Sequence, residues 1–343
     1  MRCPPAPGRR VGPFLLGFAL LLPGVLQAQS LYSGYVFGTP LEIGDAREVA
    51  LGSVGIGLGG TALSPHDPAS AVDLVLPSVA FTGQTSWTDV TQEGVASDFT
   101  SSRFPAIGII YPIPRIATVT ASFTGVLDQN WEVSEERILN VGPVGSETRV
   151  TDRFASDGGV SALRFGVARR ITPNIAVGVN AGTYLGDVTR RFNPTDGTDG
   201  AGVSLDMPFE YRVGGTAILS PALYVNAGLH YADYSDATSQ LDGVEGVAML
   251  RFGGGVEWTG LSLLGKTSAL RIGYRRGEMP FRPEFETEVT ESVISGGLGL
   301  NLLENQGAVL AEADLGVEWG ARDGSLLTED FLRLSVSVRV SGF

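Results

Sequence analysis

Regular alternation of apolar and polar residues along most of the chain is the feature that most constrains its fold. Apolar residues occupy every even position from 332 to 340, and Arg or Ser occupies every odd position from 333 to 341. Residues 309–319 repeat the pattern, with Glu312, Asp314 and Glu318 opposite an apolar set. Because successive side chains of a strand point to opposite faces, this period of two predicts strands with one apolar and one polar face.

The alternation predicts an all-β protein of about fourteen strands. Twelve strands remain the alternative, because the fourth and fifth segments have the weakest pattern. The predicted strands are 77–87, 104–112, 115–127, 131–140, 147–155, 159–169, 174–186, 205–219, 222–234, 244–258, 266–276, 289–301, 308–320 and 329–341.

Alternation alone fits either a water-soluble sandwich, with the apolar face inside, or a membrane barrel, with the apolar face in lipid. Three features favour the barrel. Most of the predicted strands have about 9–13 residues, whereas strands of soluble proteins have about 5–6. The four Trp residues fall at predicted strand ends, as in an interfacial aromatic girdle, and connections mostly alternate between short and long. We therefore expect a transmembrane antiparallel β-barrel with lipid around it.

The N-terminus has the pattern of a cleaved secretion signal. Three Arg residues precede an uncharged stretch from Val11 to Leu26, and the small residue Ala28 follows. A membrane anchor is the alternative, but Gly and Pro interrupt the stretch and it is shorter than the roughly 20 residues that a span needs. We expect a signal peptide at 1–28, a Gly-rich segment at 29–76, a barrel at 77–343 and location in a bacterial outer membrane.

Composition and motifs exclude several functions. The formal net charge of −13 argues against nucleic acid as a partner, and the single cysteine, Cys3, cannot form an internal disulfide. The two histidines, His66 and His230, have no second ligand at metal spacing, and no Gly-x-Ser-x-Gly motif is present. We therefore expect no catalytic residues, no cofactor and no metal site.

Residues 41–76 interrupt the alternation, and residues 51–60 read LGSVGIGLGG. Gly55, Gly57 and Gly60 match the G-x-G-x-x-G motif formally, but no βαβ unit surrounds them, so a dinucleotide site is disfavoured. We interpret the segment as a compact plug inside the lumen, where small residues allow backbone to approach a curved wall. A flexible periplasmic tail is the alternative. The candidate plug residues are Gly55, Gly57, Gly59, Gly60, Asp67, Pro68 and Ser70.

Charged residues on the polar faces predict a network inside the lumen. The last two strands place acidic residues opposite basic ones, and earlier strands supply a second cluster, so opposite charges can pair between neighbouring strands. The network either rigidifies the interior or docks the plug and gates a lateral opening. The candidate residues are Glu312, Asp314, Glu318, Arg333 and Arg339 in one cluster and Arg251, Glu257, Arg271 and Arg275 in the other.

The order of these features resembles the FadL-type outer-membrane transporters and the related PorV-type proteins. The resemblance rests on Asp67-Pro68-Ala69-Ser70 after a small-residue stretch, on Leu76-Pro77-Ser78 where the family has Asn-Pro-Ala, and on the last strands. It implies a plugged, 14-stranded barrel that passes hydrophobic compounds such as long-chain fatty acids, or a barrel that serves a secretion system. The terminal Phe343 resembles the aromatic residue that the outer-membrane assembly machinery recognises.

Passive uptake of a hydrophobic small molecule is therefore the leading functional prediction. The ligand would be held near the plug and leave through a gap in the wall, beside Gly and Pro residues that weaken strand pairing. A structural or secretion-associated barrel that binds a partner protein is the alternative, and a small catalytic barrel is a third. A transporter needs an apolar cavity continuous with an opening in the wall, whereas a structural barrel would have a filled lumen.

Overall fold

The computed structural model describes residue 32 and residues 39–342, apart from 42–43, 93–94, 129–130, 141–146, 187, 194–207, 237–243, 264, 284–287 and 326. The predicted signal peptide, residues 1–28, and the terminal Phe343 lie outside the described residues.

The described chain consists almost entirely of strands. The short elements near the N-terminus are β1 (Thr39–Pro40), the helix α2 (Ala46–Ala50) and the 3-10 helix η2 (Pro68–Ala71). The strands that follow are β2 (Ser78–Gln92), β3 (Val95–Ile113), β4 (Ala117–Asp128), β5 (Trp131–Asn140), β6 (Glu147–Thr172), β7 (Ile175–Leu185), β8 (Val188–Asn193), β9 (Glu210–Ser220), β10 (Leu223–Asp233), β11 (Val244–Gly246), β12 (Ala248–Leu263), β13 (Lys266–Glu278), β14 (Phe281–Pro283), β15 (Thr290–Asn305), β16 (Ala308–Asp323) and β17 (Leu327–Ser341). Among the described residues, no helix is long and apolar enough to cross a membrane.

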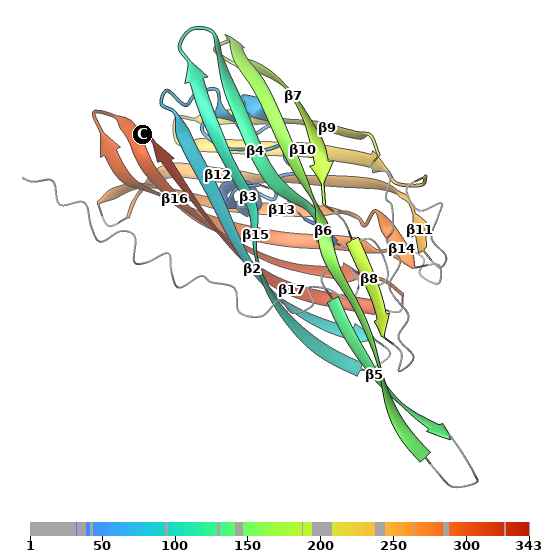
Figure 1. The fold of residues 1–343 in the computed structure, drawn as a ribbon. Helices are drawn as coiled ribbons and strands as arrows, with labels where there is room; N and C mark the ends of the chain where they lie inside the picture. Colours follow the sequence, from blue (N-terminus) through green and yellow to red (C-terminus); the bar gives the residue numbers. More distant parts are fainter. Residues whose placement is uncertain are drawn as a thin grey trace, which may run out of the picture.

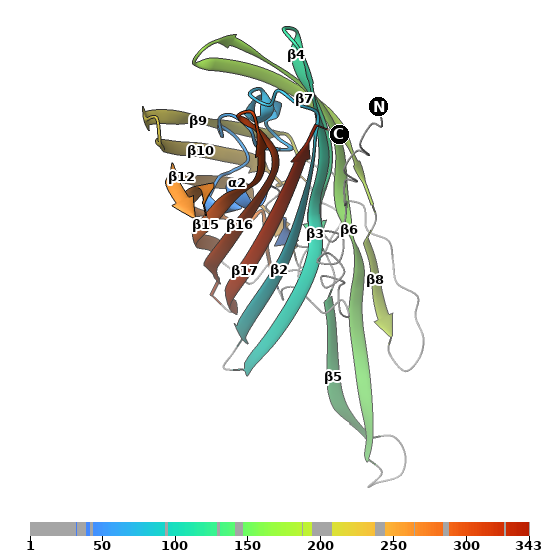
Figure 2. The ribbon, with the colours of Figure 1, turned by 90° about the vertical axis from the view of Figure 1, so that its left-hand side faces the viewer.

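One antiparallel sheet of 15 strands forms the wall, in the order β5-β6-β4-β3-β2-β17-β16-β15-β13-β12-β10-β9, and β1, β7 and β8 pair beside this path. The first and last long strands meet, because β17 pairs with β2 along its whole length of 15 residues. The sheet curves around the segment that contains α2 and η2 (Figures 1 and 2). The predicted all-β, antiparallel architecture is confirmed.

Two predicted strands, 147–155 and 159–169, are a single strand of 26 residues, β6. Gly158 has φ 134°, which L residues rarely adopt, and this lets the extended chain continue where the sequence suggested a turn. The second half of β6 pairs with β4 and β7, whereas its first half pairs with β5 and β8. The group formed by β5, β8 and the first half of β6 projects beyond the rest of the wall (Figures 1 and 2).

Burial along the strands is inverted relative to a water-soluble sheet. In β17 the odd positions are buried, and from 333 to 341 they carry only Arg or Ser, whereas Leu332 and Val340 on the other face are 44% and 47% exposed. The neighbouring strand β16 has the same pattern, since Glu318 is fully buried and Trp319 is 66% exposed. Exposed apolar side chains continue around the outer face of β13 and β15, which is far more apolar surface than a soluble monomer presents. The apolar face is therefore the one that lipid would cover.

Trp87, Trp258 and Trp319 lie within strands that run past the predicted ends, whereas Trp131 begins β5 as predicted. The observed strands extend beyond the predicted ends, so Trp87 and Trp319 each have several strand residues on either side. Both are opposite Leu332 in the register, which places them at one level of the outer face.

One line of the wall lacks strand pairing. Among the described residues, β7 pairs with β6 and β9 pairs with β10, and no pairing joins β7 to β9. Nearly every residue of both strands is exposed or half-buried on both faces. We call this line between β7 and β9 the seam; Figure 2 shows the two strands on either side of it.

Candidate functional site

The inner segment, residues 44–77, lies against the concave face of the sheet. Its helix α2 packs on β15, β16 and β17, and η2 packs on β4, β6 and β7. Asp45 caps α2 by accepting a hydrogen bond from the backbone N–H of Glu48 at 2.8 Å. The N–H of Ala46 donates to the hydroxyl of Ser337 in the wall at 2.6 Å. The two ends of the inner segment are thus attached to opposite parts of the wall.

Glycines allow the inner segment and the wall to approach at backbone distance. Gly57 has φ 79°, and a Cβ built there would lie 2.2 Å from the backbone nitrogen of Gly215 in β9. A Cβ at Gly52, with φ 58°, would meet the backbone of Tyr274 at 2.7 Å. Gly55 and Gly60 also have positive φ. Gly59 is exposed, and a Cβ built there would have no atom within 4 Å, so this residue is not part of the close contact.

The Asp67-Pro68-Ala69-Ser70 motif braces the inner segment internally. The carboxylate of Asp67 accepts hydrogen bonds from the backbone N–H groups of Gly57 and Ala69, each at 3.0 Å. Ser70 donates to the carbonyl of Asp67 at 2.7 Å. Removal from water raises the pKa of Asp67, and the N–H donors oppose that shift. Pro68 rests on β6 and β7, where glycines leave room for its ring.

Buried charges form a continuous network on the inner face of the C-terminal strands. Arg275 contacts Glu318 at 3.0 Å and Glu291 at 3.4 Å, and Arg322 contacts Glu291 at 2.8 Å. Arg333 approaches Glu318 at 3.6 Å. These side chains are at most 5% exposed. Charges buried in this way must be paired, because each unpaired charge would lose its hydration without compensation.

A second group of charges lies nearer the other end of the lumen. Arg271 contacts Glu257 at 3.1 Å and Asp314 at 2.5 Å, and Arg47 of α2 reaches the same Glu257 at 2.7 Å. Arg339 pairs with Glu312. The helix α2 is therefore held by a wall carboxylate as well as by backbone contacts.

The structure rearranges the two predicted charge clusters. Arg339 with Glu312 and Arg333 with Glu318 lie together as expected, but Asp314 contacts Arg271 of the other cluster. Arg251 donates to the carbonyl of Glu278 at 3.3 Å and is opposite Gly277 in the β12–β13 register.

Sequence reasoning missed four members of these networks, namely Arg47, Glu291, Arg322 and Glu329. Glu291 and Arg322 are opposite each other in the β15–β16 register. Arg322 has the same parity as Glu318 and lies two residues past the predicted strand end, so a longer strand would have revealed it. Nothing in the sequence indicated the contact of Arg47, because it depends on where α2 docks.

A polar cluster surrounds His66 beneath β9 and β10. Arg212 contacts Glu210 at 3.0 Å, and His230 lies 3.3 Å from the same carboxylate. These side chains line a cavity of about 30 Å³ together with His66, which is room for about one water molecule. Removal from water, and then the positive charges of Arg212 and Arg164, hold the pKa of His66 well below its ordinary range.

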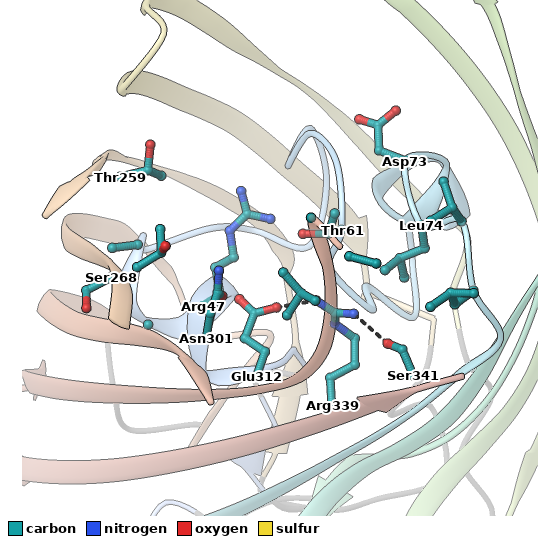
Figure 3. A pocket seen from close by; sticks show the side chains of 18 of the residues that line it. Arg47, Thr61, Asp73, Leu74, Thr259, Ser268, Asn301, Glu312, Arg339 and Ser341 are labelled. Carbon is teal, nitrogen blue, oxygen red and sulfur yellow. Dashed lines mark hydrogen bonds and ion pairs between the residues drawn. The ribbon is translucent and has the colours of Figure 1, made fainter. Parts of the chain in front are cut away.

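A larger cavity of about 420 Å³ lies between the inner segment and strands β12 to β17 (Figure 3). Leu74, Val75 and Leu76 form an apolar part of its lining, and Arg47, Glu312 and Arg339 contribute charges. Neither β7 nor β9 contributes a residue to this cavity. The cavity and the seam are thus separate in this structure, although the inner segment contacts both. In the described part of the chain, no group of three or more His, Cys, Asp or Glu residues is arranged to hold a metal ion.

No protein-family model and no curated protein matches the sequence. Among solved structures, a Pseudomonas aeruginosa FadL homologue matches with a TM-score of 0.55 and 10% identity, over 89% of this chain and 99% of that one. The Pseudomonas putida toluene transporter TodX matches with a TM-score of 0.53 and 12% identity, over 88% and 99%. The Ralstonia pickettii toluene transporter TbuX matches with a TM-score of 0.52 and 12% identity, over 90% and 100%. These structural matches confirm the fold that the sequence resemblance implied: the chain has the fold of the FadL-type barrels.

Proposed function

We propose that this protein is an outer-membrane β-barrel for passive uptake of hydrophobic small molecules. The ligand class is an acyl chain or a single-ring hydrocarbon. The protein acts as a channel without catalysis. The predicted signal peptide, and recognition of the C-terminus by the assembly machinery, are the expected route to that membrane.

The proposal rests on the inverted burial of apolar and charged side chains in the wall. Apolar side chains such as Leu332 and Ile272 face outward, and charged side chains such as Glu318 and Arg275 are buried inside. Lipid around the wall makes this distribution favourable, since water would demand the reverse. The fold shared with the FadL homologue supports the same conclusion, and the toluene transporters with this fold suggest the ligand class.

Within this function, we assign the inner segment as the plug. Gly57 and Pro68 lie directly against wall glycines, and Asp67 with Ser70 keeps the segment compact. The buried charge network of Glu291 and its partners rigidifies the wall opposite the seam. The cavity of about 420 Å³ is large enough for a small hydrocarbon, and its apolar side at Leu74 to Leu76 suits such a ligand.

A structural barrel that binds a partner protein is a second candidate. The projecting group of β5, β8 and the first half of β6 favours it, because this group extends the sheet away from the wall (Figures 1 and 2). Deleting residues 131–156 would remove most of this group. In a partner-binding barrel the deletion abolishes capture of the partner, and in a transporter it leaves uptake in place.

Uptake by intact cells tests the leading proposal. The chain is expressed in a bacterial host that lacks its own outer-membrane channel for fatty acids and hydrocarbons. Radiolabelled oleate and radiolabelled toluene are supplied at low concentration, and heat-modifiable gel migration verifies equal amounts of folded barrel. We expect faster entry of at least one probe than in cells with an empty vector. If neither probe enters faster than in cells with the empty vector, the transport function is refuted.

A further inference from the structure

One sector of the wall carries basic residues and no acidic ones. Residues 107–127 and 159–185 form the end of β3, nearly all of β4, the second half of β6 and β7, and they contain four Arg and no Asp or Glu. The whole chain, in contrast, has 37 acidic and 24 basic residues. These strands are neighbours, because β4 pairs with β3 and β6, and β7 pairs with β6. Positive charge is therefore concentrated in one sector of a protein that is acidic overall.

Three of the four arginines lie at one end of this sector. Arg115 is in the turn between β3 and β4, and Arg169 and Arg170 are near the end of β6. The registers place both segments at the end of the wall where β17 finishes (Figures 1 and 2). Thr118 is opposite Ala168, so Arg169 lies beside the start of β4, which follows Arg115 closely in the chain. Connections at this end are short, which is typical of the periplasmic side of outer-membrane barrels.

The backbone conformation at Arg115 points to a use for its side chain. Arg115 has φ 66°, and the N–H of Ile116 donates to the carbonyl of Ile113 at 3.0 Å. With Pro114 as the second residue, these are the features of a type II turn, whose third residue is normally Gly or Asn. Arg is unfavourable in this left-handed conformation, whereas Gly adopts it freely. An unfavourable residue in a turn is a reason to look for what its side chain binds.

Within the described part of the chain, two of the three guanidinium groups have no partner. Arg170 turns inward and donates to the carboxylate of Asp73 at 2.5 Å, so it holds the end of the inner segment. Arg169 is exposed and has the same parity as the exposed Val167, which places it on the outer face. No described residue forms an ion pair or a hydrogen bond with the guanidinium of Arg115 or Arg169. Both charges are therefore available to a group outside the chain.

Exposed apolar side chains lie next to these two arginines. Tyr111, Ile116, Ile171 and Ile175 are each more than half exposed. Tyr is enriched at the depth of lipid headgroups, where its ring meets acyl chains and its hydroxyl meets water. Isoleucine side chains are favoured in contact with hydrocarbon. The surface thus presents positive charge beside apolar side chains, as a phospholipid presents its phosphate beside its acyl chains.

We propose that Arg115 and Arg169 bind the phosphate of an anionic phospholipid in the periplasmic leaflet, with the neighbouring isoleucines against its acyl chains. A phosphate diester accepts charge-assisted hydrogen bonds from guanidinium groups, and the headgroup region screens this contact less than water does. The ligand class is a diacyl lipid without an ammonium group, because the two arginines would repel that cation. Phosphatidylglycerol has this chemistry. The inference rests on the proposed location of the barrel in an outer membrane and does not use its uptake function.

Local fluorescence quenching measures the lipid preference at this surface. Val177 is opposite Arg169 in the β6–β7 register, so Val177→Cys places a bimane label beside the proposed site. The parent's only cysteine, Cys3, lies in the predicted signal peptide, so the processed chain is labelled at one position. The barrel is inserted into phosphatidylcholine vesicles, and quenching is titrated with brominated phosphatidylglycerol or brominated phosphatidylcholine. We expect the phosphatidylglycerol to associate about fivefold more strongly or better.

Two double variants with equal loss of charge separate this site from the overall field. In Arg115→Gln with Arg169→Gln, the preference for phosphatidylglycerol should fall to near one. Lys266→Gln with Arg276→Gln is the matched control, since both residues are exposed cations of β13, and it should keep the preference of the parent. A preference near one in the parent, or an equal loss in both double variants, would overturn the proposal.

Inorganic phosphate distinguishes a lipid site from a site for the free anion. At constant ionic strength it should leave the preference of the parent unchanged, because it has no acyl chains to contact the isoleucines. Loss of the preference in phosphate would assign the two arginines to the free anion and overturn the lipid site.

Arg115→Gly gives a readout that a purely structural role would not give. Glycine relieves the left-handed conformation, so the urea midpoint in pure phosphatidylcholine should not fall, whereas the preference for phosphatidylglycerol should weaken. A lower midpoint with an unchanged preference would show that Arg115 serves the turn and not a lipid. Heat-modifiable migration verifies insertion before each titration. If the parent does not insert, the proposed location fails together with the lipid site; if it inserts without a lipid preference, only the lipid site fails.

Discussion

The C-terminal wall and the seam use opposite means to hold adjacent strands together. Between β16 and β17 a continuous ladder runs from Ala311 to Asp323, and buried ion pairs reinforce it from inside. At the seam, the described residues have no ladder, and a loop from another part of the chain bridges the edges. The first arrangement resists separation everywhere at once, whereas the second concentrates its resistance in a few contacts.

The largest effect is expected where the C-terminal wall loses a buried charge. Glu291 contacts Arg275, Arg322 and Arg333, and Glu291→Ala would leave these guanidinium groups with too few counter-charges. We expect a loss of about 3–5 kcal/mol in the free energy of unfolding. The measurement is the urea midpoint of heat-modifiable migration in lipid.

The exposed pair of Glu245 and Arg282 provides the control for this substitution. Glu245→Ala should cost about 0–1 kcal/mol, because solvent screens the pair. Equal losses in the two variants would show that the buried network does not stabilise the wall.

Acidic pH should weaken the seam side before the C-terminal wall. His66 has a pKa well below its ordinary value of about 6.5 in the folded state, so its contribution to stability is complete above that pH and is lost as the pH falls. The groups around it are Arg212, Arg164, Glu210, His230 and, across the small cavity, Glu48. We expect a loss of up to about 1.4 kcal/mol for the first pH unit below about 6.5.

The His66→Gln variant separates this effect from other titrations. Unfolding midpoints are measured from neutral to mildly acidic pH in both proteins. The parent should lose more stability than the variant over this range. Parallel curves would mean that His66 does not titrate on unfolding.

A smaller effect is expected at the glycines of the inner segment. Gly57→Ala would force a Cβ against the backbone of β9 at a positive φ, and we expect it to cost about 1 kcal/mol. Gly59→Ala adds a methyl group in open space and should change stability by less than about 0.5 kcal/mol. The unfolding midpoint measures both effects. If the two variants behave alike, close backbone approach at Gly57 is not what docks the segment.

The alternation predicted the faces of the strands more accurately than their ends. Leu332 and Val340 face outward as their parity indicated, and Glu318 and Arg333 face inward. Some ends were predicted too short, so Arg322 was missed, whereas the predicted 205–219 began before the observed β9, and β6 was divided at Gly158. Strand ends depend on pairing with neighbours, which a single segment does not contain.

The sequence by itself determined that the wall has one apolar and one polar face, because the period of a strand is a local property of the backbone. It also indicated the small, turn-rich character of the inner segment around Asp67. Only the tertiary structure decided that Asp314 pairs with Arg271 and that the loop around Asp67 spans the seam. Those outcomes depend on which residues, far apart in the sequence, meet when the sheet curves around the inner segment. No local sequence pattern encodes those contacts.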